Sequence, residues 1–255
     1  MRAVTVITAR LGSSRLPRKM LADLDGATVL ERLMKRVSKA KRPDVVVLAT
    51  TQEPEDDELT TAAEALGLSV FRGSTHDVLV RWRDAAAAYG ADLLVNCDGD
   101  DVFCDPPHID RIIETCEQTG AEYIVCAGLP FGAAPTGIAA SGLARVCERK
   151  LEDNTEGQGR FFAVPGIVSK AEVTAPAELG HPTARMTLDY PEDLEFFSAV
   201  LAELGAGPGD EPPPLEQIVA LLRARPDIVA INSGVQERYW QRFNALYQPV
   251  ELKSA

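Results

Sequence analysis

The chain has 255 residues, of which 45% are hydrophobic and 25% are charged, and its formal net charge is −12. This length allows one large α/β domain or a main domain with a small insert. The negative charge excludes general binding to nucleic acid, whose phosphates require a basic surface. Because no apolar run approaches the ~20 residues of a membrane helix, we expect no membrane partner and a cytoplasmic protein.

The cysteines and histidines indicate neither a disulfide framework nor a zinc site. The five cysteines are scattered without a C-x-x-C pair, which is typical of reduced and mostly buried thiols. The three histidines, His76, His108 and His181, lie far apart in the sequence and lack the ligand spacing of zinc proteins.

A basic segment follows the first expected strand. Residues 3–7 form an apolar run typical of a buried strand, and residues 8–21, here named the basic loop, contain Gly12, two serines, three arginines and one lysine but no acid. Loops at the ends of parallel strands hold phosphates in α/β proteins, and Arg and Lys are suited to bind them. A merely solvated loop is the alternative, but this position favours anion binding.

Strand and helix patterns alternate through the first half of the chain. The spacing of Thr28 and Glu31 is that of a capping box, which predicts the start of an amphipathic helix. Helices are expected at 29–40, 54–66 and 77–89, and buried strands at 45–49, 68–71 and 93–97. This alternation predicts a parallel sheet covered on both faces, with ligands at the carboxyl ends of its strands.

The second half continues the α/β pattern less regularly. Helices are expected at 109–119, 141–148, 191–204 and 215–224, and strands at 123–126, 183–188 and 228–231. The polar residues 149–160 predict an exposed flap or part of an insert. We therefore expect one domain, 1–255, with an acceptor or dimerisation insert around 128–182. A helical tail around 215–255 would pack its aromatic side chains on the body or across a dimer.

An acidic run follows the fourth expected strand. Asp98, Asp100 and Asp101 flank or follow Gly99, and two carboxylates in such a loop can bind a hard divalent cation. An ordinary polar loop that caps the next helix is the alternative. Opposite a phosphate-binding loop the cation is favoured, because it would share the phosphate oxygens.

Five stretches of the chain form a set with a known counterpart: 9–19, 49–57, 71–74, 99–100 and 187–195. Together they resemble the CTP-dependent cytidylyltransferases, which activate sugar acids and related acceptors. The similarity is strongest to the spore-coat-polysaccharide branch, with the 3-deoxy-manno-octulosonate and acylneuraminate enzymes further off. It implies a Rossmann-like α/β nucleotidyltransferase fold, a mostly parallel sheet with helices on both faces, CTP as substrate, Mg²⁺ as cofactor and a homodimer.

The resemblance also implies roles for individual residues. Arg15, Lys19 and Asp100 would be catalytic, and Asp100 and Asp189 would bind the metal. An acceptor oxyanion would attack the α-phosphorus of CTP in line, with pyrophosphate as the leaving group. The residues expected to bind the nucleotide are Ala9, Arg10, Gly12, Ser13, Ser14, Arg15, Lys19 and Asp98, together with Thr50, Arg72 and Ser74 around the cytosine and ribose.

The sequence departs from the family pattern at two places. Arg18 stands where the family usually has Gly, which adds a cation beside the phosphates. Residues 149–162 lack the Arg-Glu-His-type motif of the sugar branches, which leaves Thr136, Lys150 and Arg160 as the expected acceptor-binding residues. A small anionic acceptor, such as the phosphonoformate of phosphonate natural-product (antibiotic) pathways, is therefore favoured over a sugar acid.

Two other classes of protein are kept as alternatives. A nucleotide-sugar glycosyltransferase shares the Asp-x-Asp pattern and a similar sheet, but its diphosphate needs fewer cations than the basic loop supplies. A non-catalytic nucleotide-binding module would not need both Asp100 and Asp189. A dinucleotide-binding dehydrogenase and a P-loop enzyme are excluded, because neither glycine motif is present.

Overall fold

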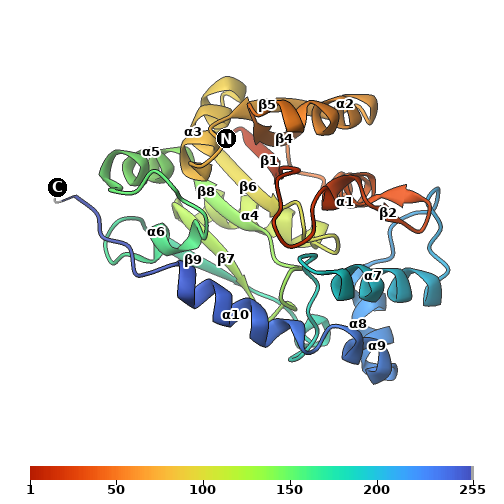
Figure 1. Cartoon of the computed structure of the whole chain (residues 1–255). Helices are drawn as coiled ribbons and strands as arrows, with labels where there is room; N and C mark the ends of the chain where they lie inside the picture. Colours follow the sequence, from red (N-terminus) through yellow and green to blue (C-terminus); the bar gives the residue numbers. More distant parts are fainter. Residues whose placement is uncertain (254–255) are drawn as a thin grey trace.

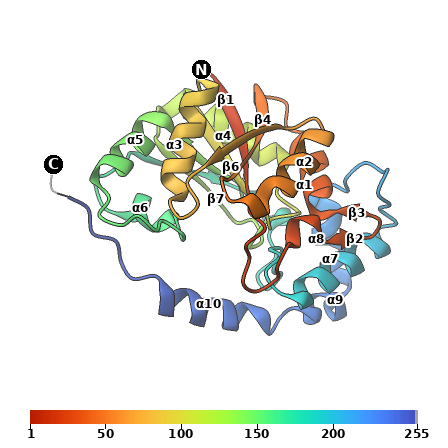
Figure 2. The same ribbon diagram turned by 45° about the horizontal axis from the view of Figure 1, so that its top comes forward.

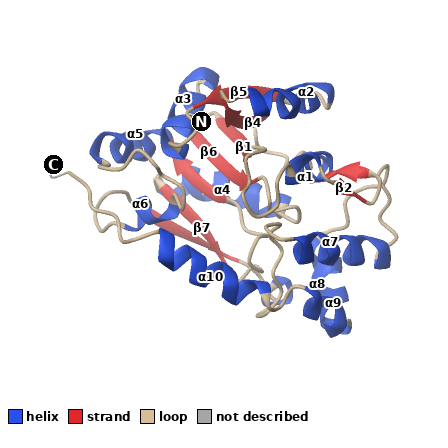
Figure 3. Ribbon diagram, viewed as in Figure 1, coloured by secondary structure: helices blue, strands red, loops and turns tan. Residues whose placement is uncertain are grey.

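The computed structural model describes residues 1–253 and shows one seven-stranded sheet with helices on both of its faces (Figure 1, Figure 3). The strands are β1 (Ala3–Thr8), β2 (Asp23–Leu24), β3 (Ala27–Thr28), β4 (Val45–Thr51), β5 (Ser69–Gly73), β6 (Leu93–Asp98), β7 (Tyr123–Ala127), β8 (Thr136–Ala139) and β9 (Lys170–Thr174). The α-helices are α1 (Val29–Val37), α2 (Asp57–Ala65), α3 (Val78–Tyr89), α4 (Pro106–Thr119), α5 (Ala140–Arg149), α6 (Gly159–Ala163), α7 (Pro191–Glu203), α8 (Leu215–Ala224), α9 (Pro226–Ile231) and α10 (Val235–Leu246).

The sheet is mostly parallel, as the alternation of strands and helices predicts. Its order is β5-β4-β1-β6-β8-β7-β9, with β8 antiparallel to both neighbours and the other pairs parallel. β2 and β3 form a separate small hairpin. The register places Thr8, the last residue of β1, beside Ala49 of β4 and Asp98 of β6. The basic loop and the acidic run therefore leave the sheet side by side.

Successive side chains of a strand point to opposite faces of the sheet, so the hydrophobic core has one part on each face. Ile7 of β1 packs in a cluster with α1, α4, α7 and α8, whereas Val4 and Val6 pack with α3, α5 and α6. All three side chains are fully buried or nearly so. This two-sided burial explains why the strands are nearly continuous apolar runs.

Capping interactions fix the start of α1 and both ends of α3. The hydroxyl of Thr28 accepts a hydrogen bond from the backbone N–H of Glu31 at 3.1 Å, which fixes the start of α1. Gly90 ends α3 with φ +62°, a left-handed conformation that favours glycine. Asp77 caps the other end of α3 by accepting from the N–H of Val80 at 3.0 Å.

Two expected strands are wrong. Residues 183–188 form a loop with an isolated bridge between Phe131 and Arg185. Met186 donates to the carbonyl of Phe131 and Leu188 to that of Asp100, so successive residues bond to different segments and no ladder forms. Residues 228–231 lie in α9, which begins at Pro226. An apolar run of four residues is too short for periodicity to separate a strand from a helix.

The sequence pattern also missed β8, β9 and α6, which lie in the expected insert 128–182. β8 and β9 belong to the main sheet. Gly137 in the middle of β8 hides the strand, but a Cβ there would lie 2.4 Å from Cγ2 of Ile112 in α4. Glycine is therefore needed for close packing of the helix on the sheet.

The expected helical tail, 215–255, contains three helices, α8, α9 and α10. The last of them, α10, runs along one edge of the molecule, and the chain after it runs toward α5 (Figure 2). It packs on the body of its own chain, because the ring of Phe131 lies 5.6 Å from that of Tyr239 and 5.7 Å from that of Trp240. Lys253 donates its N–H to the carbonyl of Arg149 at 2.7 Å. Among the described helices, none combines the length and apolar character needed to cross a bilayer.

Glu122 predicts an acid-sensitive contribution to stability. Its carboxylate accepts two 2.8 Å bonds from Arg145, and bonds from Arg145 and the N–H of Ser169 lower its pKa from 4.5 to about 2. Because the pKa is lowered in the folded state, the stabilisation exists above the unfolded pKa and disappears as the pH falls toward 2. Glu122→Gln should lower the free energy of unfolding by about 1 kcal/mol at pH 7 and by much less near pH 2.5.

Urea denaturation at the two pH values measures this difference. Glu148→Gln, which changes an exposed glutamate in α5, is the matched control and should leave the unfolding free energy unchanged. An equal loss for Glu122→Gln at both pH values would contradict the assignment.

Candidate active site

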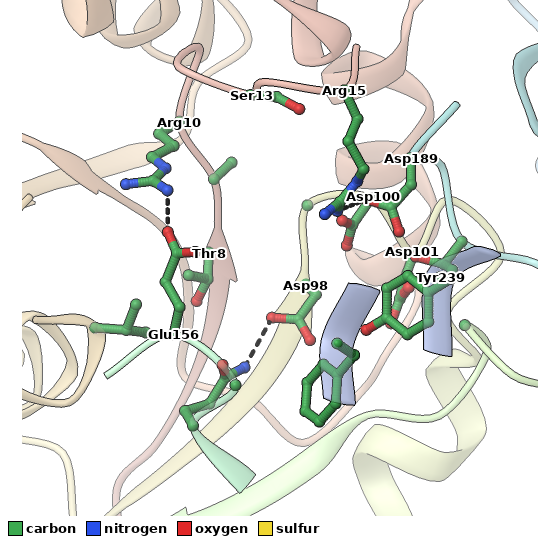
Figure 4. A pocket seen from close by; sticks show the side chains of 18 of the residues that line it. Thr8, Arg10, Ser13, Arg15, Asp98, Asp100, Asp101, Glu156, Asp189 and Tyr239 are labelled. Atoms are coloured by element: carbon green, nitrogen blue, oxygen red, sulfur yellow. Dashed lines mark hydrogen bonds and ion pairs between the residues drawn. The ribbon is translucent and has the colours of Figure 1, made fainter. Parts of the chain in front are cut away.

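A cavity of about 750 Å³ opens where β1 and β6 end (Figure 4). Its size falls within the usual range for small-molecule sites. It is lined by the basic loop, the acidic run, the segment 156–160, Asp189 and α10. Of the expected site residues, those that line it are Ala9, Arg10, Gly12, Ser13, Ser14, Arg15, Lys19, Asp98, Asp100, Arg160 and Asp189.

The basic loop is fixed by a buried acid that the sequence analysis assigned only to a helix start. Asp56 is fully buried, and its Oδ1 accepts from the N–H of Leu11 at 2.7 Å. Its other oxygen accepts from the hydroxyl of Thr51, at the end of β4. The run of acids in 54–58 gave no signal that separated Asp56 from its exposed neighbours.

Arg18 does not add a cation to the cavity, contrary to expectation. Its side chain points outward to Glu58 of α2, with Nη2 2.6 Å from Oε1. Its backbone has φ +59°, a region that favours glycine. Glycine adopts this conformation without strain, and glycine is the residue that the resemblance implies at this position.

The acidic run contacts the basic loop directly. Gly99 donates its N–H to the carbonyl of Thr8 at 2.9 Å. A Cβ at Gly99 would lie 2.7 Å from Cβ of Ala9 and 3.0 Å from Sδ of Met20. The glycine between Asp98 and Asp100 therefore allows the two loops to meet.

Lys19 lies between the two expected metal ligands. Its Nζ is 2.6 Å from Oδ2 of Asp100 and 3.2 Å from Oδ1 of Asp189, and it also donates to the carbonyl of Leu188 at 2.7 Å. Burial lowers the pKa of Lys19, but the charges of Asp100 and Asp189 outweigh burial and hold it above its ordinary value. Arg15 forms a further ion pair with Asp189.

Asp189 is held by a buried network that the sequence analysis missed. Arg185, 1% exposed, donates from Nη2 to Oδ2 of Asp189 at 2.9 Å and from Nε to Oδ1 of Asp193 at 3.0 Å. Asp193 in turn accepts from the N–H groups of Asp189 and Tyr190, at 2.9 and 3.0 Å. Burial raises the pKa of Asp189, but Lys19 and Arg15 outweigh it and keep that pKa below its ordinary value.

Asp98 lies between the two ends of the cavity (Figure 4). Its Oδ1 accepts from Nδ2 of Asn96 at 3.0 Å and from Nε2 of Gln158 at 3.4 Å. Burial and the nearby charge of Asp100 raise the pKa of Asp98 to about 6. The carboxylates of this loop thus differ in electrostatic environment although they are adjacent in the chain.

The expected flap, 149–160, is anchored rather than exposed throughout. Nζ of Lys150 is 2.5 Å from Oδ2 of Asp77, and the hydroxyl of Thr155 donates to Oδ1 of the same residue at 2.9 Å. The segment then places Glu156 in the cavity, where it pairs with Arg10 and accepts from the hydroxyl of Tyr247 at 3.1 Å. It therefore forms one wall of the site.

Five expected site residues do not line the cavity. Arg72 donates to the carbonyls of Thr51 and Glu53 and pairs with Asp57, so it holds the ends of β4 and β5 together. Its guanidinium is thus engaged by the protein and does not face the cavity lining. The five residues are Thr50, Arg72, Ser74, Thr136 and Lys150.

A basic loop that meets an acidic pair at the strand ends of an α/β sheet suits a nucleotidyltransferase. The family model described as cytidylyltransferase matches residues 4–157. The spore coat polysaccharide biosynthesis protein SpsF of Bacillus subtilis is 29% identical over 229 residues, which cover 87% of this chain and 94% of SpsF. The chain belongs to the cytidylyltransferase family.

Solved structures show the same fold. A cytidylyltransferase of Leptospira borgpetersenii superposes with a TM-score of 0.80 at 24% identity, covering 90% of this chain and 97% of that one. A CMP:2-keto-3-deoxy-manno-octonic acid synthetase in complex with CTP gives 0.63 at 18% identity, covering 80% and 100%. These likenesses confirm the expected α/β nucleotidyltransferase fold.

The carboxylates of Asp100 and Asp189 supply only part of the ligand shell that a hard cation such as Mg²⁺ requires. Carboxylate oxygens are ligands that Mg²⁺ prefers, and the metal is commonly held by one or two carboxylates together with substrate phosphates. Within residues 1–253, no three His, Cys, Asp or Glu side chains converge as a metal site. Phosphate oxygens would therefore have to complete the ligand shell, and Lys19 would have to release one or both carboxylates.

Proposed function

We propose that this protein transfers CMP from CTP to a small anionic acceptor, with Mg²⁺ as cofactor and pyrophosphate as the second product. The proposal is carried by one observation. Asp100 and Asp189, which lie far apart in the sequence, meet across Lys19 in a cavity whose rim is the basic loop. A site that combines cations for a triphosphate with two acids for a metal suits nucleotidyl transfer.

Residues of the basic loop would bind the triphosphate. Ser13 and Ser14 offer hydroxyls, while Arg15 and Lys19 would exchange carboxylate partners for phosphate oxygens. Their charges would then stabilise the pyrophosphate as it leaves. Asp100 and Asp189, freed of Lys19, would hold Mg²⁺, which when bound polarises phosphate oxygens.

The acceptor would bind at the side of the cavity formed by the segment 156–160 and α10. Arg160 is the expected acceptor-binding residue that lines this side, where its guanidinium lies 5.0 Å from the ring centre of Tyr247. An anionic acceptor carries its nucleophilic oxygen already charged, so a dedicated base is not required. We favour a phosphonate such as phosphonoformate, and a sugar acid is the alternative acceptor.

A homodimer is part of the proposal. Trp240 is 41% exposed and Leu246 57% exposed on α10, which are high values for large apolar side chains on one helix. Sedimentation velocity should give a dimer mass, and a monomer at micromolar concentration would contradict this part.

Pyrophosphate release tests the function. The protein is incubated with CTP, Mg²⁺ and a panel of phosphonates and sugar acids, with and without excess chelator. We expect release that needs both an acceptor and the divalent cation. Absence of release with every acceptor, in protein that binds CTP, would contradict the proposal.

A further inference from the structure

Arg185, the buried residue that holds Asp189, is itself held by the C-terminal helix α10. Its Nη2 donates to Oδ2 of Asp189 at 2.9 Å, and its Nε donates to Oδ1 of Asp193 at 3.0 Å. Its Nη1 donates to Oε1 of Gln236, in the first turn of α10, at 3.0 Å. Every nitrogen of this guanidinium therefore has an acceptor, which a cation that is 1% exposed requires.

The two carboxylate oxygens of Asp189 make different contacts. Oδ2 accepts from Arg185, whereas Oδ1 lies 3.2 Å from Nζ of Lys19 and pairs with Arg15. The torsion about the Cβ–Cγ bond of an aspartate is broad, so a carboxylate keeps one oxygen forward only when other bonds hold it. The bond from Arg185 to Oδ2 supplies this constraint and leaves Oδ1 toward the basic loop.

Three contacts join Arg185 to α10 and to the residues just before it. Besides the bond to Gln236, the ring centre of Tyr239 lies 4.9 Å from Cζ of Arg185. Nδ2 of Asn232 donates to the backbone carbonyl of Arg185 at 3.1 Å. Gln236 and Tyr239 are three residues apart and so lie on one face of the helix. Gln236, which is half-buried, is the member of this set that bonds to a guanidinium nitrogen, so it fixes the direction of the fork.

We propose that Gln236 is a positioning residue, which holds the guanidinium of Arg185 and thereby the rotation of the Asp189 carboxylate. The helix that forms one side of the cavity then also sets which oxygen of Asp189 faces Lys19. The inference rests on the proposed function, in which Asp100 and Asp189 hold the divalent cation. Loss of a residue that orients a metal-binding carboxylate commonly weakens metal affinity by about 10- to 100-fold.

Mn²⁺ binding in the absence of nucleotide tests this role, because CTP itself chelates the ion. Free Mn²⁺ is measured by electron paramagnetic resonance in Lys19→Met, in which the acidic pair is free of the ammonium. Adding Gln236→Met, which keeps the length of the side chain and removes the acceptor oxygen, should raise the Mn²⁺ dissociation constant by about tenfold. Gln236→Glu, which keeps an acceptor oxygen, should stay within about threefold of Lys19→Met.

Gln241→Met is the matched control in the same background. Gln241 belongs to the same helix, is exposed and donates from Nε2 to Oε1 of Glu237 at 3.1 Å. Its replacement should leave the Mn²⁺ dissociation constant unchanged. If Gln236→Met lowers the thermal midpoint but keeps that constant, the contact only fastens the helix and the inference is overturned. A partial loss of fold lowers the number of sites, whereas a misplaced carboxylate raises the dissociation constant.

The failure of this inference differs from the failure of the proposed function. Mn²⁺ binding that is absent from Lys19→Met, or that survives Asp189→Asn in that background, overturns the metal assignment and this inference together. Mn²⁺ binding that Asp189→Asn abolishes but Gln236→Met leaves unchanged overturns only the role of Gln236.

Discussion

Asp100→Asn should lower the rate of pyrophosphate release by about 10³-fold while leaving the protein folded. The substitution keeps the size of the side chain and removes the charge that faces Lys19 at 2.6 Å. A neutral amide neither attracts a divalent cation as a carboxylate does nor directs the Lys19 ammonium. The initial rate at saturating CTP and acceptor measures the effect.

A surface aspartate provides the control for Asp100. Asp84 is 45% exposed at its side chain and pairs with Arg83, away from the cavity. Asp84→Asn should keep the wild-type rate, because exposed ion pairs contribute little. If Asp100→Asn retained more than about a tenth of the wild-type rate, the proposed role of the acidic pair in transition-state stabilisation would be wrong.

Lys19→Met should have two measurable effects of opposite direction. Turnover should fall by roughly 10²–10³-fold, because the leaving pyrophosphate loses a cation. Without nucleotide, Asp100 and Asp189 lose the ammonium that lies between them, so Mg²⁺ should bind more tightly to the variant than to wild type. The thermal midpoint, measured with and without Mg²⁺, should therefore rise more in Lys19→Met.

Arg18, the residue before Lys19, provides a control that separates this effect from a general loss of positive charge. Arg18 points to Glu58 outside the cavity, so Arg18→Met should keep turnover within roughly twofold and leave the response to Mg²⁺ unchanged. An equal response to Mg²⁺ in wild type and Lys19→Met would show that Lys19 does not compete for the metal ligands.

The sequence predicted the parts of the fold and site that depend on local pattern. Buried strands, helix caps at Thr28 and Gly90, and the ends of β1 and β6 all follow from neighbouring residues. The meeting of the basic loop with Asp98 and Asp100 follows from them, because adjacent parallel strands end at the same edge. Asp189 came only from the resemblance, since no local pattern joins it to Lys19.

What the sequence missed depends on contacts between distant segments. Arg185 is an ordinary residue in an expected strand until Asp193 and Asp189 surround it. The backbone around it bonds to separate segments, so the expected strand is a loop. Arg72, expected at the base, instead holds two strand ends. Arg81 of α3, which lines the cavity and is buried, gave no signal because a helical arginine is usually solvated.

Phosphorus-31 NMR of a single reaction mixture shows which phosphorus–oxygen bond of CTP the protein breaks. With CTP, Mg²⁺ and a productive anionic acceptor, we expect the β- and γ-phosphorus signals of CTP to be replaced by that of pyrophosphate. The α-phosphorus should appear at the same rate in a new CMP–acceptor signal. Release of the terminal phosphate alone, with CDP as the remaining nucleotide, would contradict it.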